Sequence, residues 1–292
     1  MPEPEARPCD RCDRTFIMTY TRGRADYAQA RRCDCYQRCP LCDDTRYFFE
    51  TDPNGYRFAR PCQCVVVDRK ITWFNDARIP AKYGRAHLPD FFTHQPGATR
   101  PPEVSAAARA ALKFAQGFTP GRRGLLLHGP VGTGKTHLTV AILRYLVLRL
   151  GVRVRFIEFL HLLADLRATF GDHGRAEDVM RPLVEVPVLA IDELGKGKEG
   201  EWERDVLDEL ISKRYNAHRT TLFTTNCQVE PLPRGGPYPP GTIGRPALRP
   251  DERSAADKPL EDRIGTRLYS RIAEMCDFYA LLGDDLRRQR SG

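Results

Sequence analysis

The chain has 292 residues, 29% of them charged, and a formal net charge of +8 at pH 7. This length allows one sizeable α/β domain and a smaller module. No window approaches the roughly 18 apolar residues of a membrane span, and the first residues lack a signal-peptide pattern. We therefore exclude membrane-spanning and secreted classes and expect a cytoplasmic protein with no membrane partner.

Cysteines are crowded at the start of the chain, where eight of the ten lie between Cys9 and Cys64. They repeat one pattern twice, about thirty residues apart: a C-x-x-C pair and then a C-x-C pair. In a reducing compartment such crowding indicates metal, and four thiolates around a hairpin-length spacer suit structural zinc. The predicted Zn²⁺ ligands are Cys9, Cys12, Cys33 and Cys35 for one ion, and Cys39, Cys42, Cys62 and Cys64 for the other.

Two other interpretations of the cysteines stay open. The inner pairs Cys33, Cys35, Cys39 and Cys42 could share one ion, or the thiols could be free. A segment this polar needs a staple to fold, which favours metal. Two ions with four thiolates each would lower the net charge to about +4, so charge alone does not separate a nucleic-acid partner from a solvated surface.

Aromatic residues of this module could form a recognition surface, but we expect them to fill its small core. They are Phe16, Tyr20, Tyr47, Phe48, Phe49 and Tyr56. Residues 65–102 carry several prolines and no clear period, and we expect a connector there rather than core. A helix is predicted from Glu103 to about Gln116, ended by Gly117.

A glycine-rich loop joins an apolar strand at 125–128 to a helical pattern over 137–150, the order that a P-loop requires. Its glycines let backbone N–H groups close around phosphates, and the helix start attracts anions. Lys135 would reach the terminal phosphates, and the Thr136 hydroxyl would bind Mg²⁺. The predicted nucleotide contacts are Gly129, Pro130, Val131, Gly132, Thr133, Gly134, Lys135, Thr136 and His137.

Two acidic residues follow the second strand predicted after the P-loop helix. A strand at 152–157 and helices over 160–170 and 176–183 lead to the apolar strand 186–191. This last strand delivers Asp192 and Glu193, the Walker B arrangement. Asp192 would hold Mg²⁺ through water, and Glu193 would polarise the attacking water as general base.

The remaining chain completes the same pattern. After a helix over 202–218, a strand at 221–224 leads to Asn226, which could orient the lytic water if this strand lies between the Walker strands. Residues 229–259, rich in proline and glycine, predict a long surface loop. A helix over 260–275 and a strand over 276–282 follow, and no helical lid is expected after them.

Together these motifs resemble the AAA+ ATPases, and among them the DnaC/DnaI-type replicative helicase loaders and the related IstB-type transposition helper. The matching stretches are 124–138, 189–195, 210–216, 224–226 and 263–271. The second cysteine unit is similar to the zinc head of DnaI-type loaders. The resemblance implies an α/β fold with a five-stranded parallel sheet. It also implies a zinc module (1–68), a linker with one helix (69–120) and an AAA+ domain (121–292) containing the insert 229–259.

The resemblance further implies a loader that binds ATP and single-stranded DNA, engages a replicative helicase through its zinc module and self-associates through its ATPase core. Arg271 would be the arginine finger reaching a neighbouring subunit's ATP, with Arg267 as the alternative. Arg167, Arg175 and Arg181 fall where this clade contacts single-stranded DNA.

Two competing functions stay open. One is an IstB-like ATPase helper of DNA transposition, and the other is a zinc adaptor that holds ATP without turnover. Intact Lys135, Asp192 and Glu193 argue against the adaptor.

Overall fold

The computed structural model describes residues 9, 11–12, 15–21, 23, 25–89, 91, 101–169, 175–197, 200–229 and 258–283. Contacts divide the chain into two compact units, residues 1–85 with 144–153 and residues 86–143 with 154–292. The domain boundaries predicted at 68 and 120 stay predictions, and the predicted insert 229–259 lies almost entirely outside the described residues. No helix within these ranges is long and apolar enough to cross a membrane.

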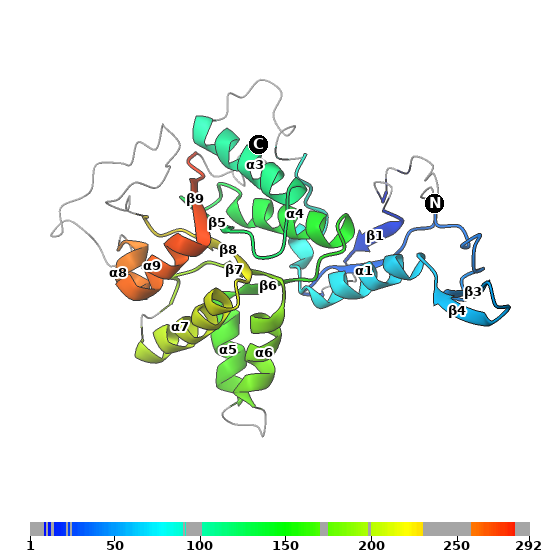
Figure 1. Cartoon of the computed structure of the whole chain (residues 1–292). Helices are drawn as coiled ribbons and strands as arrows, with labels where there is room; N and C mark the ends of the chain where they lie inside the picture. The colour runs from blue at the N-terminus through cyan, green and yellow to red at the C-terminus, as the bar shows by residue number, and fades with distance from the viewer. Residues whose placement is uncertain are drawn as a thin grey trace. The chain divides into compact units, whose positions relative to one another are not determined.

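The first unit carries two antiparallel hairpins, each between a C-x-x-C pair and a C-x-C pair (Figure 1). The first hairpin consists of β1 (Ile17–Tyr20) and β2 (Gln29–Arg32), and the second of β3 (Tyr47–Thr51) and β4 (Arg57–Pro61). The helix α1 (Val65–Asp76) and the 3₁₀ turn η1 (Ala81–Tyr83) follow.

The helix α1 corrects the interpretation of residues 65–102 as a connector without core. It packs on β2, where the Asn75 side-chain oxygen accepts a 2.6 Å hydrogen bond from the Ala30 N–H. Further along the same stretch, Ile79, Leu88 and Phe91 are buried. Sequence periodicity missed them because the helix opens on β-branched valines and the later apolar residues are buried singly between turns.

The second unit is built on a five-stranded sheet in the order β6-β7-β8-β5-β9, with every described pairing parallel. The predicted fold class is confirmed. Its strands are β5 (Gly124–His128), β6 (Val154–Glu158), β7 (Val188–Asp192), β8 (Thr220–Thr225) and β9 (Cys276–Ala280). Because β8 lies between β5 and β7, the two Walker motifs follow strands on either side of it.

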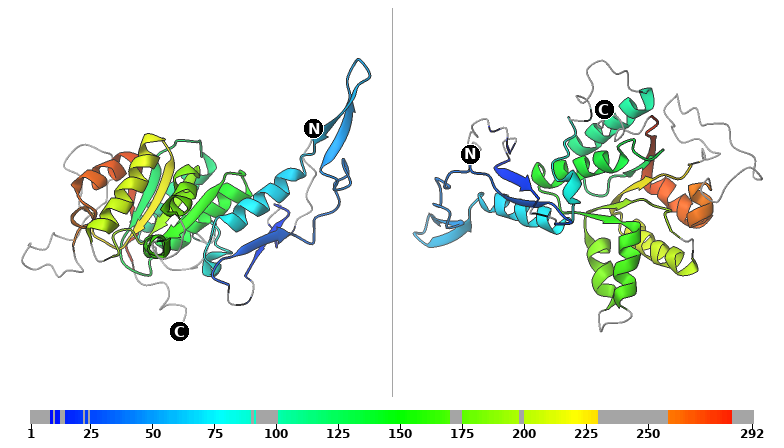
Figure 2. Two further views of the ribbon diagram at one scale, coloured as in Figure 1. Left: turned by 90° about the horizontal axis from the view of Figure 1, so that it is seen from below. Right: turned by 180° about the vertical axis from the view of Figure 1, so that it is seen from behind.

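Helices cover both faces of this sheet, with α3 and α4 on one side and α5, α6 and α7 on the other (Figures 1 and 2). They are α3 (Pro102–Gln116), α4 (Lys135–Leu148), α5 (Phe159–Thr169), α6 (Ala176–Glu185), α7 (Glu201–Asn216), α8 (Leu260–Ile264) and α9 (Thr266–Met275). The single helix predicted over 260–275 is wrong: Gly265 adopts φ 87° and separates α8 from α9.

A buried arginine fixes the strands that carry the acidic residues. Arg214, at the end of α7, is fully buried and donates hydrogen bonds to the carbonyls of Leu183, Val186 and Thr220 at 2.7, 2.9 and 2.6 Å. Burial lowers the pKa of its guanidinium to about 9. These bonds connect the end of α6 and the approach to β7 with the start of β8, and so set the alignment of the two strands.

Candidate nucleotide site

The glycine-rich loop between β5 and α4 has the backbone that its sequence predicts. Gly129, Gly132 and Gly134 adopt φ values of 139°, 85° and 95°, a region that side chains disfavour. A Cβ on Gly129 would collide with the Leu281 carbonyl, and the Leu281 N–H donates to the His128 carbonyl at 2.7 Å. The first loop glycine is therefore required by close packing against the chain that follows β9.

The loop is closed around its own lysine. Lys135 is only 6% exposed, and its Nζ donates to the carbonyls of Gly129 and Pro130 at 2.8 and 2.6 Å. The Thr133 hydroxyl donates to the Pro130 carbonyl at 3.0 Å. Phosphate oxygens are acceptors of the same kind, so the ammonium can exchange a carbonyl for a phosphate with little movement. At the edge of the loop, Val131 is exposed.

The first turn of α4 brings the Walker A threonine to the Walker B aspartate. The Thr136 hydroxyl lies 3.0 and 3.1 Å from the two carboxylate oxygens of Asp192. Burial raises the pKa of the Asp192 carboxyl to about 6. A hydroxyl and a buried carboxylate are oxygen ligands that suit Mg²⁺, and a cation would relieve the cost of burying the charge. These residues fit a magnesium ion. Beside them on α4, the His137 ring lies 6.1 Å from the Phe91 ring.

Thr224 on β8 is a site residue that sequence reasoning missed. Its hydroxyl donates to Asp192 Oδ1 and accepts from the Glu193 N–H at 3.0 Å, and its carbonyl accepts from the Leu194 N–H at 2.8 Å. One buried threonine therefore orients both acidic residues. The signal was available, because a strand with threonines at fully buried positions needs polar partners for their hydroxyls.

Glu193 leaves the sheet with a left-handed backbone at φ 57°. Its Oε2 lies 2.6 Å from Lys196 Nζ, so the carboxylate is paired in this state. Asn226, the predicted water-orienting residue, directly follows β8 and is exposed. The strand position on which that prediction depended is confirmed, while the role of Asn226 stays a prediction.

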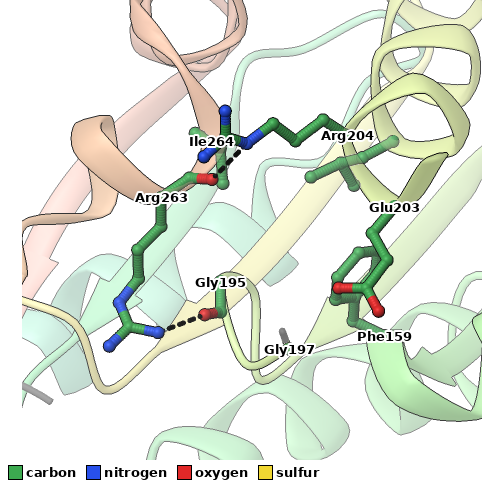
Figure 3. Close-up of a pocket in the computed structure, with 8 residues that line it drawn as sticks. Phe159, Gly195, Gly197, Glu203, Arg204, Arg263 and Ile264 are labelled. Carbon is green, nitrogen blue, oxygen red and sulfur yellow. Dashed lines mark hydrogen bonds between the residues drawn. The ribbon is translucent and has the colours of Figure 1, made fainter. Parts of the chain in front are cut away.

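The loop after Glu193 lines a small pocket (Figure 3). Arg263 of α8 donates to the Gly195 carbonyl at 3.0 Å, and Arg204 Nε donates to the Arg263 carbonyl at 3.2 Å. Helix α8 is therefore hydrogen-bonded to the segment that follows Glu193, the predicted general base. Among the described residues, the pocket is lined by Phe159, Gly195, Gly197, Glu203, Arg204, Leu207, Arg263 and Ile264, and none of these belongs to the P-loop.

The two candidate finger arginines differ in their surroundings. Arg271 donates to Asp208 Oδ1 at 2.8 Å and also to the Ser212 hydroxyl, so it is bound to α7 of its own chain. Arg267 is exposed and has no hydrogen-bond or ion-pair partner among the described residues. The geometry favours Arg267 as the side chain free to reach a neighbour, which reverses the ranking from sequence; the assignment stays a prediction.

The three arginines suggested for DNA contact also differ. Arg167 is paired with the buried Glu203 at 3.0 Å, and its guanidinium lies 4.9 Å from the Trp202 ring. Arg175 and Arg181 are exposed. The last two are available to a phosphate backbone, and Arg167 is engaged in packing α5 against α7.

The eight cysteines form the two groups that their spacing predicts. Within each group the sulfurs lie within 4.8 Å of one another, and the grouping of Cys33 and Cys35 with Cys39 and Cys42 is not found among the described residues. The four cross-hairpin S–S distances are 3.8, 3.4, 3.6 and 3.4 Å. Zinc bound tetrahedrally at ~2.3 Å puts sulfurs about 3.8 Å apart, so both groups fit zinc.

Known proteins share the core of this chain. Residues 103–232 match the family model described as IstB-like ATP binding protein. The replicative helicase loader DnaC of Escherichia coli K12 is 29% identical over 127 residues, which cover 43% of this chain and 51% of that protein. The crystal structure of the DnaC helicase loader superposes with a TM-score of 0.51 at 27% identity, covering 68% of this chain and 98% of that one.

The core of this chain is similar to the AAA+ domain of DnaC-type proteins. The chain spans about half the length of the curated DnaC relatives it matches, 51% of the E. coli protein. A longer match, 23% identical over 184 residues, is to the uncharacterized protein YqaM of Bacillus subtilis and covers 60% of this chain. Both cysteine groups lie before residue 103, outside the match to the family model.

Proposed function

We propose that this chain is an ATP-dependent loader of a replicative helicase, which binds ATP with Mg²⁺ in its core and engages its client through the zinc module. The observation that carries the proposal is the network in which Asp192 receives hydrogen bonds from both Thr136 and Thr224. It joins Walker A, Walker B and the strand between them in one buried cluster. The likeness of the core to DnaC supplies the client class.

In this proposal each residue has a defined task. The loop glycines and Lys135 hold the phosphates, and Thr136 and Asp192 hold the magnesium ion, which when bound neutralises phosphate charge. Glu193 must leave Lys196 before its carboxylate can accept the proton of the lytic water. Thr224 holds the Asp192 carboxylate and the Glu193 backbone N–H in place while the Glu193 side chain moves. Asn226 is assigned to orienting the water.

The site also needs a neighbour. A finger from another subunit, Arg267 or Arg271, would stabilise charge on the transferred phosphoryl group, so hydrolysis would depend on assembly. Arg175 and Arg181 are assigned to single-stranded DNA, and the two Cys₄ groups to structural zinc.

The client is tested with a trap variant. Glu193→Gln with ATP should hold the assembled state, and an affinity pull-down with this variant from a lysate of the same organism should recover the hexameric helicase. Recovery of a transposase instead would overturn the loader in favour of the IstB-like helper, which the family-model match over 103–232 keeps as the second candidate. Hydrolysis by the wild type is measured with and without single-stranded DNA, and no turnover in either condition would leave only the adaptor.

The finger is tested by complementation. Lys135→Ala removes phosphate binding and leaves the finger intact, whereas Arg267→Ala does the reverse. Each variant alone should hydrolyse ATP at least about 10³-fold more slowly than wild type, and mixing the two should restore part of the activity. Arg271→Ala in the same assay decides between the two arginines, since only the finger variant complements Lys135→Ala. Nucleotide binding by each arginine variant should stay near that of wild type.

A further inference from the structure

The two cysteine units share one backbone frame, which allows their residues to be matched one to one. Thr15 and Thr45 each donate to the carbonyl of the preceding C-x-x-C cysteine at 2.6 Å. The Cys33 N–H donates to the Phe16 carbonyl at 2.8 Å, and the Cys62 N–H donates to the Arg46 carbonyl at 2.7 Å. Phe16 and Arg46, whose carbonyls accept these bonds, adopt left-handed backbones at φ 59° and 72°.

In this frame, Ile17 and Thr19 of the first hairpin correspond to Tyr47 and Phe49 of the second. Ile17 and Thr19 are 2% and 8% exposed, whereas Tyr47 and Phe49 are 54% and 61% exposed. The first hairpin is covered by packing that includes α1 on β2, and every residue of β4 is exposed. The prediction that the aromatics fill the core of the module is therefore wrong for Tyr47, Phe49 and Tyr56, whereas Phe48 is half-buried.

The exposed apolar residues are concentrated in this one place. The described residues expose nine large hydrophobic side chains, and five of them lie between residues 41 and 58: Leu41, Tyr47, Phe49, Tyr56 and Phe58. Such a concentration marks an interaction site, because single exposed apolar residues are ordinary but clusters of them are not. Nothing in the described part of the first unit covers them.

One face of the β3–β4 hairpin combines exposed aromatic side chains with an arginine. Strand register places Tyr47, Phe49, Thr51, Arg57, Ala59 and Pro61 together, and we name this set the β3–β4 face. The Arg57 guanidinium lies 4.4 Å from the Phe49 ring centre and has no carboxylate partner among the described residues. The opposite face differs, since Arg60 pairs with Glu50 at 2.6 Å and lies 5.2 Å from Phe58.

The charge around this face favours a protein over a nucleic acid. Residues 38–64 contain four arginines and four acidic residues. A zinc ion with four thiolates would add about −2, so the unit repels rather than attracts a phosphate backbone. Tyr, Phe and Arg without acidic residues are instead the composition of the buried centre of protein interfaces. Arg57 has no carboxylate partner among the described residues, which leaves its guanidinium available to a carboxylate of a partner.

We propose that the β3–β4 face is the client-binding surface, and that its partner offers an apolar groove bordered by a carboxylate. Tyr47 and Phe49 fill the groove, and Arg57 pairs with the carboxylate. The first hairpin serves as scaffold. The assignment rests on the proposed function for the identity of the client, the replicative helicase. Rigid aromatic side chains beside an arginine are the residues that dominate the affinity of such contacts.

The test measures the affinity of full-length variants for the purified helicase. The double change Tyr47→Ser/Phe49→Ser should weaken binding at least about tenfold, and Arg57→Glu should have a similar effect. Phe58→Ser on the opposite face is the matched control and should stay within about threefold. Zinc content and thermal unfolding of each variant confirm that the module has kept its fold, which exposed positions should allow.

The possible outcomes separate this assignment from the proposed function. If the wild type does not bind the helicase, the proposed function falls and the assignment falls with it. If the wild type binds and the double variant binds equally well, only the assignment is overturned. A double variant that keeps the helicase but loses single-stranded DNA would show that the face reads nucleic acid. A photo-cross-linker at position 49 should label the helicase and not the chain itself.

Discussion

The first and second cysteine units have the same metal frame and opposite surfaces. Equivalent threonine hydroxyls and cysteine N–H groups make the same hydrogen bonds in both cysteine units. Ile17 is nevertheless buried, whereas its counterpart Tyr47 is exposed. Four thiolates and a few backbone bonds specify the hairpin, and the outward residues are then free to change. In the proposal made above, the first copy of this small module supports folding and the second serves recognition.

Removal of one zinc ligand from each unit gives the largest expected contrast. Cys33→Ser and Cys62→Ser should each lower bound zinc from about two ions to about one per chain. Because α1 packs on the first hairpin, Cys33→Ser should lower the unfolding free energy of the surrounding structure by several kcal/mol, whereas Cys62→Ser should unfold only its own hairpin. Metal analysis and thermal unfolding measure both, and equal losses of stability would break the contrast.

Truncation of matched side chains gives the next largest difference. Ile17→Ala removes buried methyl groups and should cost about 2–4 kcal/mol of unfolding free energy. Tyr47→Ala, at the equivalent exposed position, should change it by less than about 0.5 kcal/mol. Denaturant unfolding of both variants provides the comparison. A large cost at Tyr47 would mean that the second hairpin is covered in solution.

Removal of Arg32 tests whether this side chain holds the two cysteine units together. Its guanidinium donates two 2.8 Å hydrogen bonds to the Asp68 carboxylate of α1. It also lies 3.5 Å from the Asp44 carboxylate of the second cysteine unit and 4.5 Å from the centre of the Tyr36 ring. Arg32→Ala should cost about 1–2 kcal/mol. The neighbouring Arg31→Ala, which breaks an exposed pair with Asp34 and an exposed 3.2 Å bond to the Arg32 carbonyl, should cost a few tenths of a kcal/mol. Similar effects on unfolding would remove the bridging role of Arg32.

The smallest predicted effects are equal in the two units. Thr15→Ala and Thr45→Ala each remove a hydroxyl that donates to the equivalent cysteine carbonyl, that of Cys12 or Cys42. Each should lower the unfolding free energy by about 0.5–1 kcal/mol. Hydrogen exchange of the two hairpins resolves changes of this size. A much larger cost in one unit would contradict the equivalence of their frames.

Local patterns in the sequence predicted the parts of the molecule that depend on local spacing. The P-loop, the acidic pair after β7 and both thiolate groups are each specified by a few neighbouring residues. Predictions failed where a partner lies far along the chain. Thr224 acquires its role from Asp192 on the neighbouring strand, and Arg271 is paired with Asp208 of another helix. Tyr47 and Phe49 read as core because composition does not record whether a helix covers a hairpin.

The close packing of Gly129 against Leu281 has a consequence for the order of events during synthesis. The loop and the segment that supports it are about 150 residues apart in the chain. At a synthesis rate of about 5–20 residues per second, this distance corresponds to about 8–30 s. We expect a chain that ends before β9 to retain no nucleotide, which a truncated variant on a nucleotide-affinity matrix would check. Only a chain with a completed core would then bind ATP, so an unfinished chain would not enter the ATP-bound state.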